Sequence, residues 1–143
     1  MEIINQMELR FLRLPENEAF ARVAVSAFAV QLNPPLDVLA DIKPAVSEAV
    51  TNAIVHGYEN ETGMIAITSA LLDDGMLEVS VSDTGKGIDN IARAMQPFFT
   101  TQPEKERSGM GFSVMQTFMD HVAVESAPGR GTTVRMKKRL QEK

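Results

Sequence analysis

The N-terminal part of the chain changes from a strand-like to a helix-like hydrophobic pattern. Apolar and polar residues alternate from Met7 to Leu14, which predicts a strand with one buried face. From Asn17 to Gln31 the apolar residues follow a helical spacing instead. The pattern predicts a first helix whose buried face consists of Phe20, Val23, Ala24, Ala27 and Phe28.

A second helical pattern begins after Asn33-Pro34-Pro35, a combination that interrupts regular structure. It runs from Leu36 to about Val55 and stops at Gly57, since glycine commonly follows the C-terminus of a helix. Pro44 lies inside this pattern and has no backbone N–H. We therefore expect either a kink or two helical pieces.

The rest of the chain reads as four strands and one more helix. Met64–Leu72 and Met76–Ser82 are strand-like, and Asp73-Asp74-Gly75 between them is a typical hairpin turn. The segment 83–110 is rich in Gly, Pro and polar residues, with a short helical patch near 90–95. The remaining elements that we expect are a helix over Phe112–Met119 and strands over His121–Ser126 and Thr132–Lys138.

About five strands and three main helices, with neighbouring strands joined by hairpins, predict an α+β fold. We expect a two-layer α/β sandwich, with a mostly antiparallel, mixed sheet and the helices on one face. No repeat, low-complexity segment or linker is visible, so residues 1–143 are interpreted as a single domain. The basic tail, Arg135 to Lys143, is interpreted as a solvated edge strand with a frayed end.

Composition and charge narrow the possible functions. The chain has no cysteine and only two histidines, which excludes a Cys-based zinc site and disfavours a His-rich metal site. Its net charge of −5 disfavours bulk nucleic-acid binding, which usually needs a basic face. No apolar run reaches the roughly 20 residues of a membrane span, and the N-terminus lacks a signal-peptide pattern. We therefore expect a cytoplasmic protein without direct nucleic-acid or membrane contact.

The first candidate motif is a polar stripe on the second helix. Glu48, Asn52 and His56 follow one another at intervals of four residues, so they share one side of the helix beside an apolar arc. Taken alone, the stripe could equally be a solvent-facing side of the helix.

The second motif, Asp83-Thr-Gly-Lys-Gly87, directly follows an apolar strand. A carboxylate delivered into a turn with two glycines lets a flat ligand approach the backbone closely. An ordinary Asp-rich turn would have the same sequence pattern. Asp-Thr-Gly also resembles the active-site triplet of aspartic proteases, but the Lys86-Gly87 continuation departs from that pattern. A protease would also leave Glu48 and Asn52 unexplained.

The third motif, Ser108-Gly-Met-Gly-Phe-Ser113, places glycines at the start of a helix. Backbone N–H groups and the helix dipole can bind phosphate oxygens there. The motif has neither the dinucleotide-binding glycine pattern nor the Walker lysine, so neither of those nucleotide sites fits.

In this order, and followed by Gly131-Thr132, the three motifs resemble the ATP-binding domains of the gyrase, Hsp90, histidine-kinase and MutL superfamily. Pro97-Phe-Phe-Thr-Thr101 is similar to the short aromatic box of the histidine-kinase branch. The resemblance covers about residues 36–138. It implies the Bergerat-type fold, in which ATP lies between helices and sheet under a mobile lid, here about residues 97–110.

The resemblance also implies a role for each motif residue. Asn52 would ligate Mg²⁺ through its side-chain oxygen, and Glu48 would orient or deprotonate the attacking nucleophile. Asp83 would accept a hydrogen bond from the adenine amino group, while His56 would be structural. The other implied ATP contacts are Gly85, Gly87, Thr101, Arg107, Ser108, Gly109, Met110, Gly111, Phe112 and Thr132.

Within the superfamily the chain most resembles the small anti-sigma kinases of sporulation, through residues 46–58 and 107–112. This resemblance implies a homodimer that binds and inhibits a sporulation sigma factor. It also implies transfer of the γ-phosphoryl group of Mg-ATP to a serine of an anti-anti-sigma protein. Arg22 on the first helix is a candidate partner contact, with a solvated arginine as the alternative.

Two other functions stay open at this point. One is a non-catalytic binding module that uses nucleotide only as a conformational ligand. The other is a detached histidine-kinase ATP domain, which would phosphorylate a histidine on a helix pair that this sequence does not show.

Overall fold

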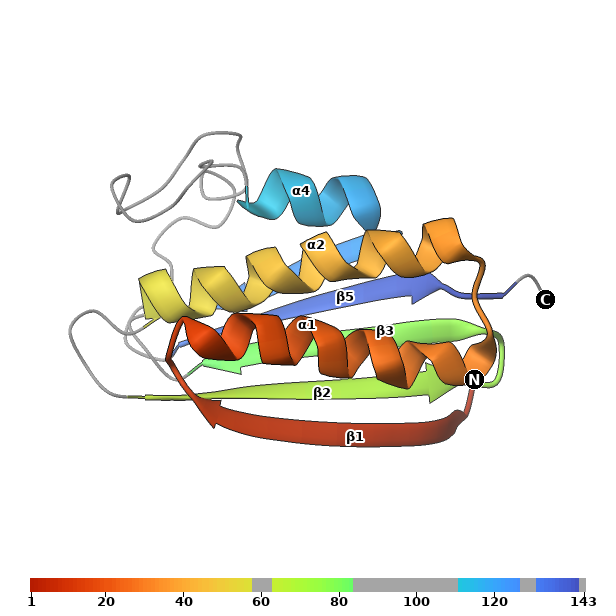
Figure 1. The fold of residues 1–143 in the computed structure, drawn as a ribbon, viewed down its shortest axis with the longest axis horizontal. Coiled ribbons are helices and arrows are strands. Elements are labelled where there is room, and N and C mark those ends of the chain that lie inside the picture. The colour runs from red at the N-terminus through yellow and green to blue at the C-terminus, as the bar shows by residue number, and fades with distance from the viewer. Residues whose placement is uncertain (58–62, 84–110, 127–130, 142–143) are drawn as a thin grey trace.

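The computed structural model describes residues 1–57, 63–83, 111–126 and 131–141. Within them the chain forms two layers, a five-stranded sheet and a layer of helices on one of its faces (Figure 1). The elements are β1 (Ile3–Leu12), α1 (Glu16–Ala29), the 3-10 turn η1 (Val30–Leu32), α2 (Leu36–Asn52), the π-helix η2 (Ala53–Gly57), β2 (Met64–Leu72), β3 (Met76–Asp83), α4 (Gly111–Phe118), β4 (His121–Ser126) and β5 (Thr132–Arg139). The predicted α+β sandwich is confirmed.

The strands lie in the order β1-β2-β3-β5-β4, and each neighbouring pair is antiparallel. The described strands therefore form an antiparallel sheet and not the mixed one that was expected. The prediction that the basic tail is an edge strand is also wrong, because β5 pairs with β3 on one side and β4 on the other. Its cationic Arg135 alternates with the buried Val134 and Met136, so a central strand can expose a cation on its outer face.

The hairpin between β2 and β3 forms where the sequence predicts it. Gly75 has φ +89°, a conformation that a residue with a Cβ rarely adopts. A Cβ added there would also lie 2.8 Å from the carbonyl oxygen of Gln141. The Gly75 carbonyl accepts the backbone N–H of Leu140 at 2.8 Å, so this turn also fixes the chain beyond β5.

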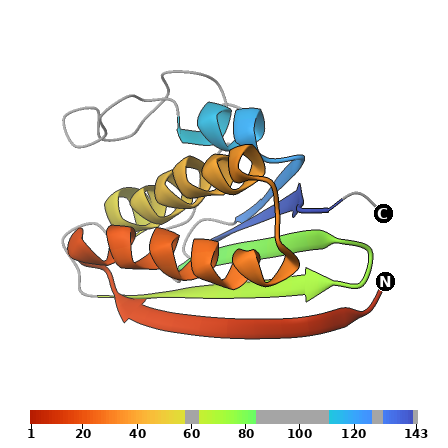
Figure 2. The ribbon, with the colours of Figure 1, turned by 45° about the vertical axis from the view of Figure 1, so that its right-hand side comes forward.

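Helices α1 and α2 cover the same face of the sheet, and α4 packs against α2 (Figure 2). The core between the layers combines side chains from both helices and from the inner face of the strands. Its largest fully buried members are Ile42, Ile65, Ile67, Leu71, Leu77, Met115, Met136 and Leu140.

The prediction of the buried face of α1 is wrong for four of its five residues. Ala24 is half-buried and Ala27 exposed, and the side chains of Phe20 and Val23 are 55% and 57% exposed. Phe28 alone is buried as predicted. The buried residues of α1 are Ala21, Val25, Ser26, Phe28 and Ala29. This helix is apolar on more than one side, and packing selects the side whose small residues allow close approach to the sheet and α2.

The second helix is continuous through Pro44, so the expectation of two helical pieces is wrong. The irregularity lies at its end, where α2 passes into the π-helix Ala53–Gly57 directly after Asn52. The predicted end at Gly57 is confirmed.

Ser69 in β2 is 1% exposed, and its hydroxyl has no hydrogen-bond partner among the described residues. Burying a hydroxyl without a partner costs about 1–3 kcal/mol. Ser69→Ala should therefore raise the free energy of unfolding by about 1 kcal/mol in urea denaturation. The neighbouring Thr68→Ala, on the exposed face of the sheet, should change it by less than about 0.5 kcal/mol. A destabilised Ser69→Ala variant would show that the hydroxyl has a partner after all.

Candidate functional site

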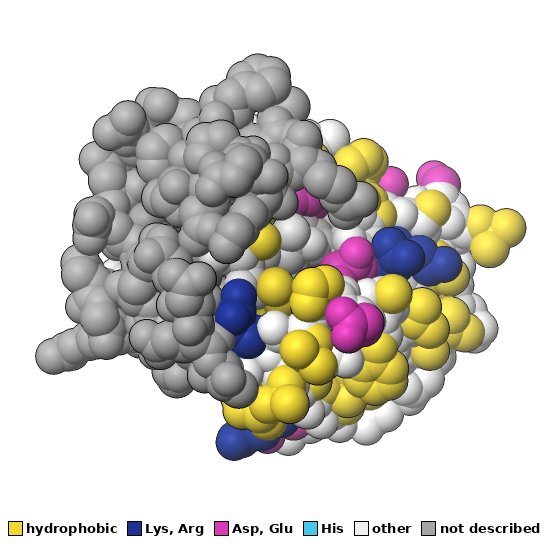
Figure 3. Space-filling view, turned by 60° about the vertical axis from the view of Figure 1, so that its left-hand side comes forward, with side chains coloured by type: hydrophobic (Ala, Val, Ile, Leu, Met, Phe, Trp, Pro, Cys, Tyr) yellow, Lys and Arg dark blue, Asp and Glu magenta, His cyan; other side chains and the backbone are white. Residues whose placement is uncertain are grey.

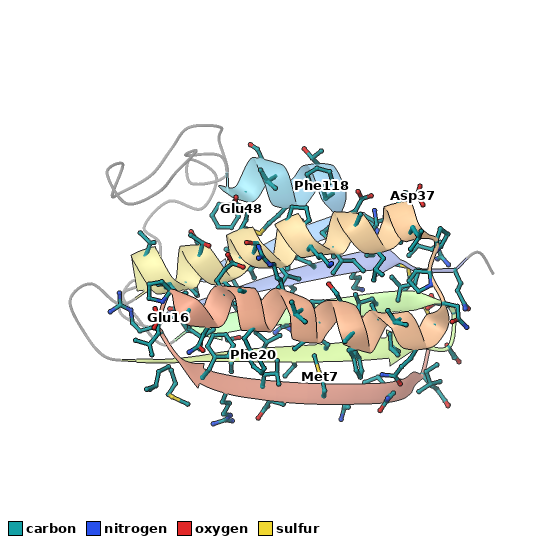
Figure 4. The ribbon with its side chains drawn as sticks, in the orientation of Figure 1. Met7, Glu16, Phe20, Asp37, Glu48 and Phe118 are labelled. Atoms are coloured by element: carbon teal, nitrogen blue, oxygen red, sulfur yellow. The ribbon has the colours of Figure 1, made fainter. Side chains whose placement is uncertain are left out.

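The polar stripe of α2 lies at the border between the core and the surface. Glu48 and Asn52 are both half-buried, whereas Ala49 and Val50 between them are buried in the core. Glu48 lies on the side of α2 where α4 begins (Figure 4). The stripe is thus not the fully solvated helix side that the sequence alone allowed.

A lysine aligns α4 with α2. Lys138 donates to the carbonyl of Phe118, the last residue of α4, at 2.7 Å and to Asp41 Oδ2 of α2 at 3.2 Å. The C-terminus of α4 therefore lies beside the first half of α2. At 1.5 Å per residue, the eight residues of α4 span about 12 Å, close to the roughly 11 Å from Asp41 to Glu48. The start of α4, at Gly111, consequently lies near the polar stripe of α2 (Figure 1).

Asp83 and Thr132 face each other at the ends of β3 and β5. They are register partners in the antiparallel ladder, and each is 6% exposed. The Ser126 hydroxyl donates to the Gly131 carbonyl at 3.0 Å and lies 2.8 Å from Thr132 Oγ1. Because Ser126 has one hydroxyl hydrogen, Thr132 is the donor in the second contact, which leaves the Thr132 oxygen able to accept.

Thr133, the next residue in β5, points to the opposite face of the sheet, as its place in the strand predicts. Its hydroxyl lies 3.0 Å from the hydroxyl of Ser82, its register partner in β3. Thr133 therefore takes no part in the cluster formed by Asp83 and Thr132.

The ends of two helices and two strands meet at one end of the molecule. The C-terminal ends of α2 and β3 lie there, together with the N-terminal ends of α4 and β5 (Figure 1). The π-helix that follows Asn52 contacts β3, the strand that ends in Asp83. The structure thus brings Glu48, Asn52, Asp83 and Thr132 to the same end, although they come from three separate elements.

The other predicted ATP contacts divide into two groups. Gly111 and Phe112 are both buried at the start of α4, and the Phe112 side chain belongs to the hydrophobic core, so only its backbone could face a ligand. The remaining residues lie outside the described part of the chain, as do the predicted helical patch at 90–95, the lid at 97–110 and the side chain of His56. These residues are Gly85, Gly87, Thr101, Arg107, Ser108, Gly109 and Met110.

A groove of about 470 Å³ runs between α1 and α2 and connects Arg22 with Glu48. Arg22 is not simply solvated, since its Nη1 lies 3.5 Å from Glu18 Oε2, one turn earlier. The groove also contains residues that the sequence analysis missed, namely Val23, Lys43, Pro44 and Ser47. Pro44 lies four residues before Glu48 and so shares its helix face, which was an available signal, whereas Val23 comes from α1 and depends on the fold.

Within the described ranges, no three His, Asp or Glu side chains are placed to hold a metal ion together. Among the described residues at this end, Asn52 offers a side-chain amide oxygen that could ligate a metal, with a phosphate substrate and water as its other ligands. That arrangement fits Mg²⁺, which usually keeps several waters and binds through few protein oxygens. No helix in the described ranges is long and apolar enough to cross a membrane.

Comparisons with known proteins agree with the sequence motifs. Residues 11–138 match the histidine kinase-like ATPase domain. The chain is 59% identical to the anti-sigma F factor of Thermoanaerobacter pseudethanolicus over 138 residues, which cover 96% of each protein. It is 55% identical to the anti-sigma F factor of Clostridium acetobutylicum over 136 residues, or 95% of this chain and 94% of that one.

Solved structures agree at the level of the fold. The RsbU and RsbW domains of a Mycobacterium tuberculosis protein match 95% of this chain with a TM-score of 0.69 and 22% identity, and this chain spans 32% of that protein. The catalytic domain of the histidine kinase ThkA matches 98% of this chain, and all of its own length, with a TM-score of 0.59 and 20% identity. Together with the sequence identities, these matches rule out the aspartic-protease alternative. The chain belongs to the family of histidine kinase-like ATPase domains and, within it, to the anti-sigma F factors.

Proposed function

We propose that this chain binds Mg-ATP where α2, α4, β3 and β5 meet, inhibits a sporulation sigma factor, and phosphorylates a serine of an anti-anti-sigma protein in the cytoplasm. Membership in the anti-sigma F factors supports the partners and the reaction. The observation that carries the site is the convergence of Asn52 and Glu48 with Asp83 and Thr132 at one end of the molecule.

The adenine end of the site is formed by Asp83 and Thr132. An ionised carboxylate only accepts hydrogen bonds, so Asp83 suits the exocyclic amino group of adenine. Its low exposure of 6% strengthens this preference, because water competes poorly at a buried acceptor. The Thr132 oxygen, with its hydrogen directed to Ser126, adds a second acceptor next to it. Gly85 and Gly87 would leave room for the base.

The phosphate end is formed by Asn52 and the start of α4. Asn52 would hold Mg²⁺ through its amide oxygen, and the metal, when bound, would offset phosphate charge. The first N–H groups of α4, from Gly111, have no partner within the helix and would bind phosphate oxygens. Contacts from Thr101, Arg107, Ser108, Gly109 and Met110 would complete the phosphate site.

Glu48 is placed to act on the attacking serine. One turn before Asn52, its carboxylate would accept the hydroxyl proton as the serine oxygen bonds to the γ-phosphorus. The bond between the γ-phosphorus and the bridging oxygen breaks, and ADP leaves with that electron pair. The products are phosphoserine and ADP, with the proton held on Glu48.

The groove between α1 and α2 would guide the substrate protein to Glu48. Arg22 lies at the α1 side of this groove with a side chain that is 42% exposed. Its 3.5 Å contact with Glu18 is too long for a good hydrogen bond, so the guanidinium keeps donors for a partner carboxylate. Lys43, also in the groove, adds a second cation for an acidic partner segment.

A second copy of the chain would cover the outer side of α1. Apolar side chains gather on one face of the molecule between single acidic and basic groups (Figure 3). The side chains of Phe20 on α1 and of Val30, the residue after α1, are each about half exposed and do not line the groove. Helix α1 covers the half of the sheet that ends in β1, and the outer edge of β1 pairs with no other described strand (Figure 1). An apolar strip next to an open strand edge suits a symmetric homodimer.

We predict that Mg-ATP binding depends on Asn52 and Asp83. Asn52→Ala should weaken ATP binding in magnesium by roughly ten- to a hundredfold, and Asp83→Asn should weaken it by about tenfold because the amide can present a donor to a donor. Thr133→Ala, on the opposite sheet face, is the control and should bind normally. Calorimetry that gives wild-type affinity for both site variants would refute this nucleotide site.

We predict that Glu48 serves chemistry more than binding. Glu48→Gln should keep ATP and sigma-factor affinity but slow transfer to the anti-anti-sigma protein by roughly 10²- to 10⁴-fold, the range of a lost general base. Glu16→Gln, at the exposed start of α1, is the control. Labelled ATP would report the rate, and a rate near that of the wild type would remove Glu48 from the mechanism. Acid-stable phosphoserine, as opposed to acid-labile phosphohistidine, would exclude the histidine-kinase alternative.

We predict that two sides of α1 have separate partners. Phe20→Asp should convert dimers to monomers in analytical ultracentrifugation, since a charge would enter the apolar strip.

Arg22→Glu should leave the dimer and ATP affinity intact while weakening sigma or anti-anti-sigma binding by about tenfold or more, because it reverses a paired charge. Arg135→Ala, on the exposed face of the central strand β5, is the control for both. If Arg22→Glu binds both partners with wild-type affinity, Arg22 does not contact a partner and pairs only within the chain.

A further inference from the structure

Arg13 joins two segments that are far apart in the sequence, the end of β1 and the turn after α2. Its Nε and Nη2 both donate to the backbone carbonyl of Ile54, at 3.2 and 2.9 Å. Its own backbone N–H donates to the carbonyl of Gly63 at 3.0 Å, just before β2 begins. The side-chain contacts are partly buried, so water competes with them less than at the surface.

The turn that Arg13 contacts is the π-helix Ala53–Gly57. Single π-helical turns are rare and occur frequently at functional sites. Carbonyl groups at the C-terminal end of a helix carry the negative end of its dipole, which attracts a cation. A guanidinium that donates twice to the Ile54 carbonyl therefore stabilises this irregular turn from outside.

The same turn directly follows Asn52 and closes the end of α2. Asn52 is the last residue of α2, and Ile54 follows it by two residues. The Ile54 side chain is 7% exposed and belongs to the core, so the turn is held by the core through this side chain and by β1 through the carbonyl. Loss of the second attachment would remove the tie between this turn and the segment after β1.

We propose that Arg13 is a positioning residue for Mg-ATP binding, which holds the turn after α2 so that the Asn52 side chain meets the metal. The inference rests on the proposed nucleotide site and adds to it a residue that lies in none of its motifs. Arg13 acts through the backbone of Ile54 and not by contact with the nucleotide. Its effect is therefore confined to the part of ATP affinity that depends on magnesium.

The test compares ATP affinity with magnesium and with EDTA in four variants, by calorimetry well below each variant's melting temperature. Arg13→Ala should weaken ATP binding by about tenfold in magnesium and by less than about twofold in EDTA, for the loss of two charge-assisted hydrogen bonds. Arg13→Lys, which keeps one donor to Ile54, should recover part of the loss. Arg10→Ala is the matched control, because Arg10 is exposed on β1, three residues before Arg13, and pairs only with Glu8 among the described residues. Asn52→Ala reports whether the metal site itself exists.

The outcomes separate the two proposals. Suppose that Asn52→Ala loses the magnesium dependence of ATP binding, as expected. If Arg13→Ala then weakens ATP binding equally in magnesium and in EDTA, or does not weaken it, the role of Arg13 is overturned. If Asn52→Ala keeps that dependence, the metal site fails and the role of Arg13 fails with it. A lowered melting temperature of Arg13→Ala without a change in magnesium dependence shows a structural contact only and also overturns the inference.

Discussion

The burial of one side of α2 is the constraint on which the rest of the structure depends. Its Ile42, Val46 and Val50 are each 0% exposed, and burying such a side chain contributes about 1.5–3 kcal/mol. Rotation of the helix about its axis would expose several of them at once, so its orientation is fixed by the core. The core thereby fixes the side of α2 on which Glu48 and Asn52 lie. The polar stripe remains at the border of the core, where α4 and the ends of β3 and β5 meet it.

Most of the fold follows from local sequence patterns, and the failures have a common physical cause. The hairpin of β2 and β3, the strand over His121–Ser126 and the end of the second helix at Gly57 are set by turn residues and short-range periodicity, and the structure has them as predicted. The buried face of α1 and the central position of β5 depend on which elements pack together. A helix apolar on several sides and a strand with one basic face fit two environments equally well, and only tertiary packing selects between them.

The residues of the candidate site also divide into those that local sequence motifs reveal and those that depend on tertiary packing. Glu48, Asn52, Asp83 and Thr132 lie in motifs that can be found by spacing, and their roles come from the resemblance to a family and not from the spacing itself. Arg13 lies in no motif, because its contact with Ile54 joins residues 41 positions apart. Lys43 and Ser47 become visible only when α1 is placed beside α2 to form the groove. Residues that bind a ligand directly can be recognised from sequence, whereas those that position them through distant backbone atoms require the fold.

The N-terminal segment connects the nucleotide end with the partner surfaces. Arg13 at the end of β1 is tied to the turn after Asn52, and α1 begins three residues later at Glu16. Along α1, Arg22 and Val23 line the groove with α2, whereas the half-exposed Phe20 does not. A movement of the turn after α2 would therefore be transmitted to α1 through a short, hydrogen-bonded connection, in which Asn17 also bonds the carbonyl of Leu12 at 2.8 Å. In the proposed function, this connection is a physical route by which a nucleotide at Asn52 would alter the binding of partners at α1, because both sites would act on the same turn.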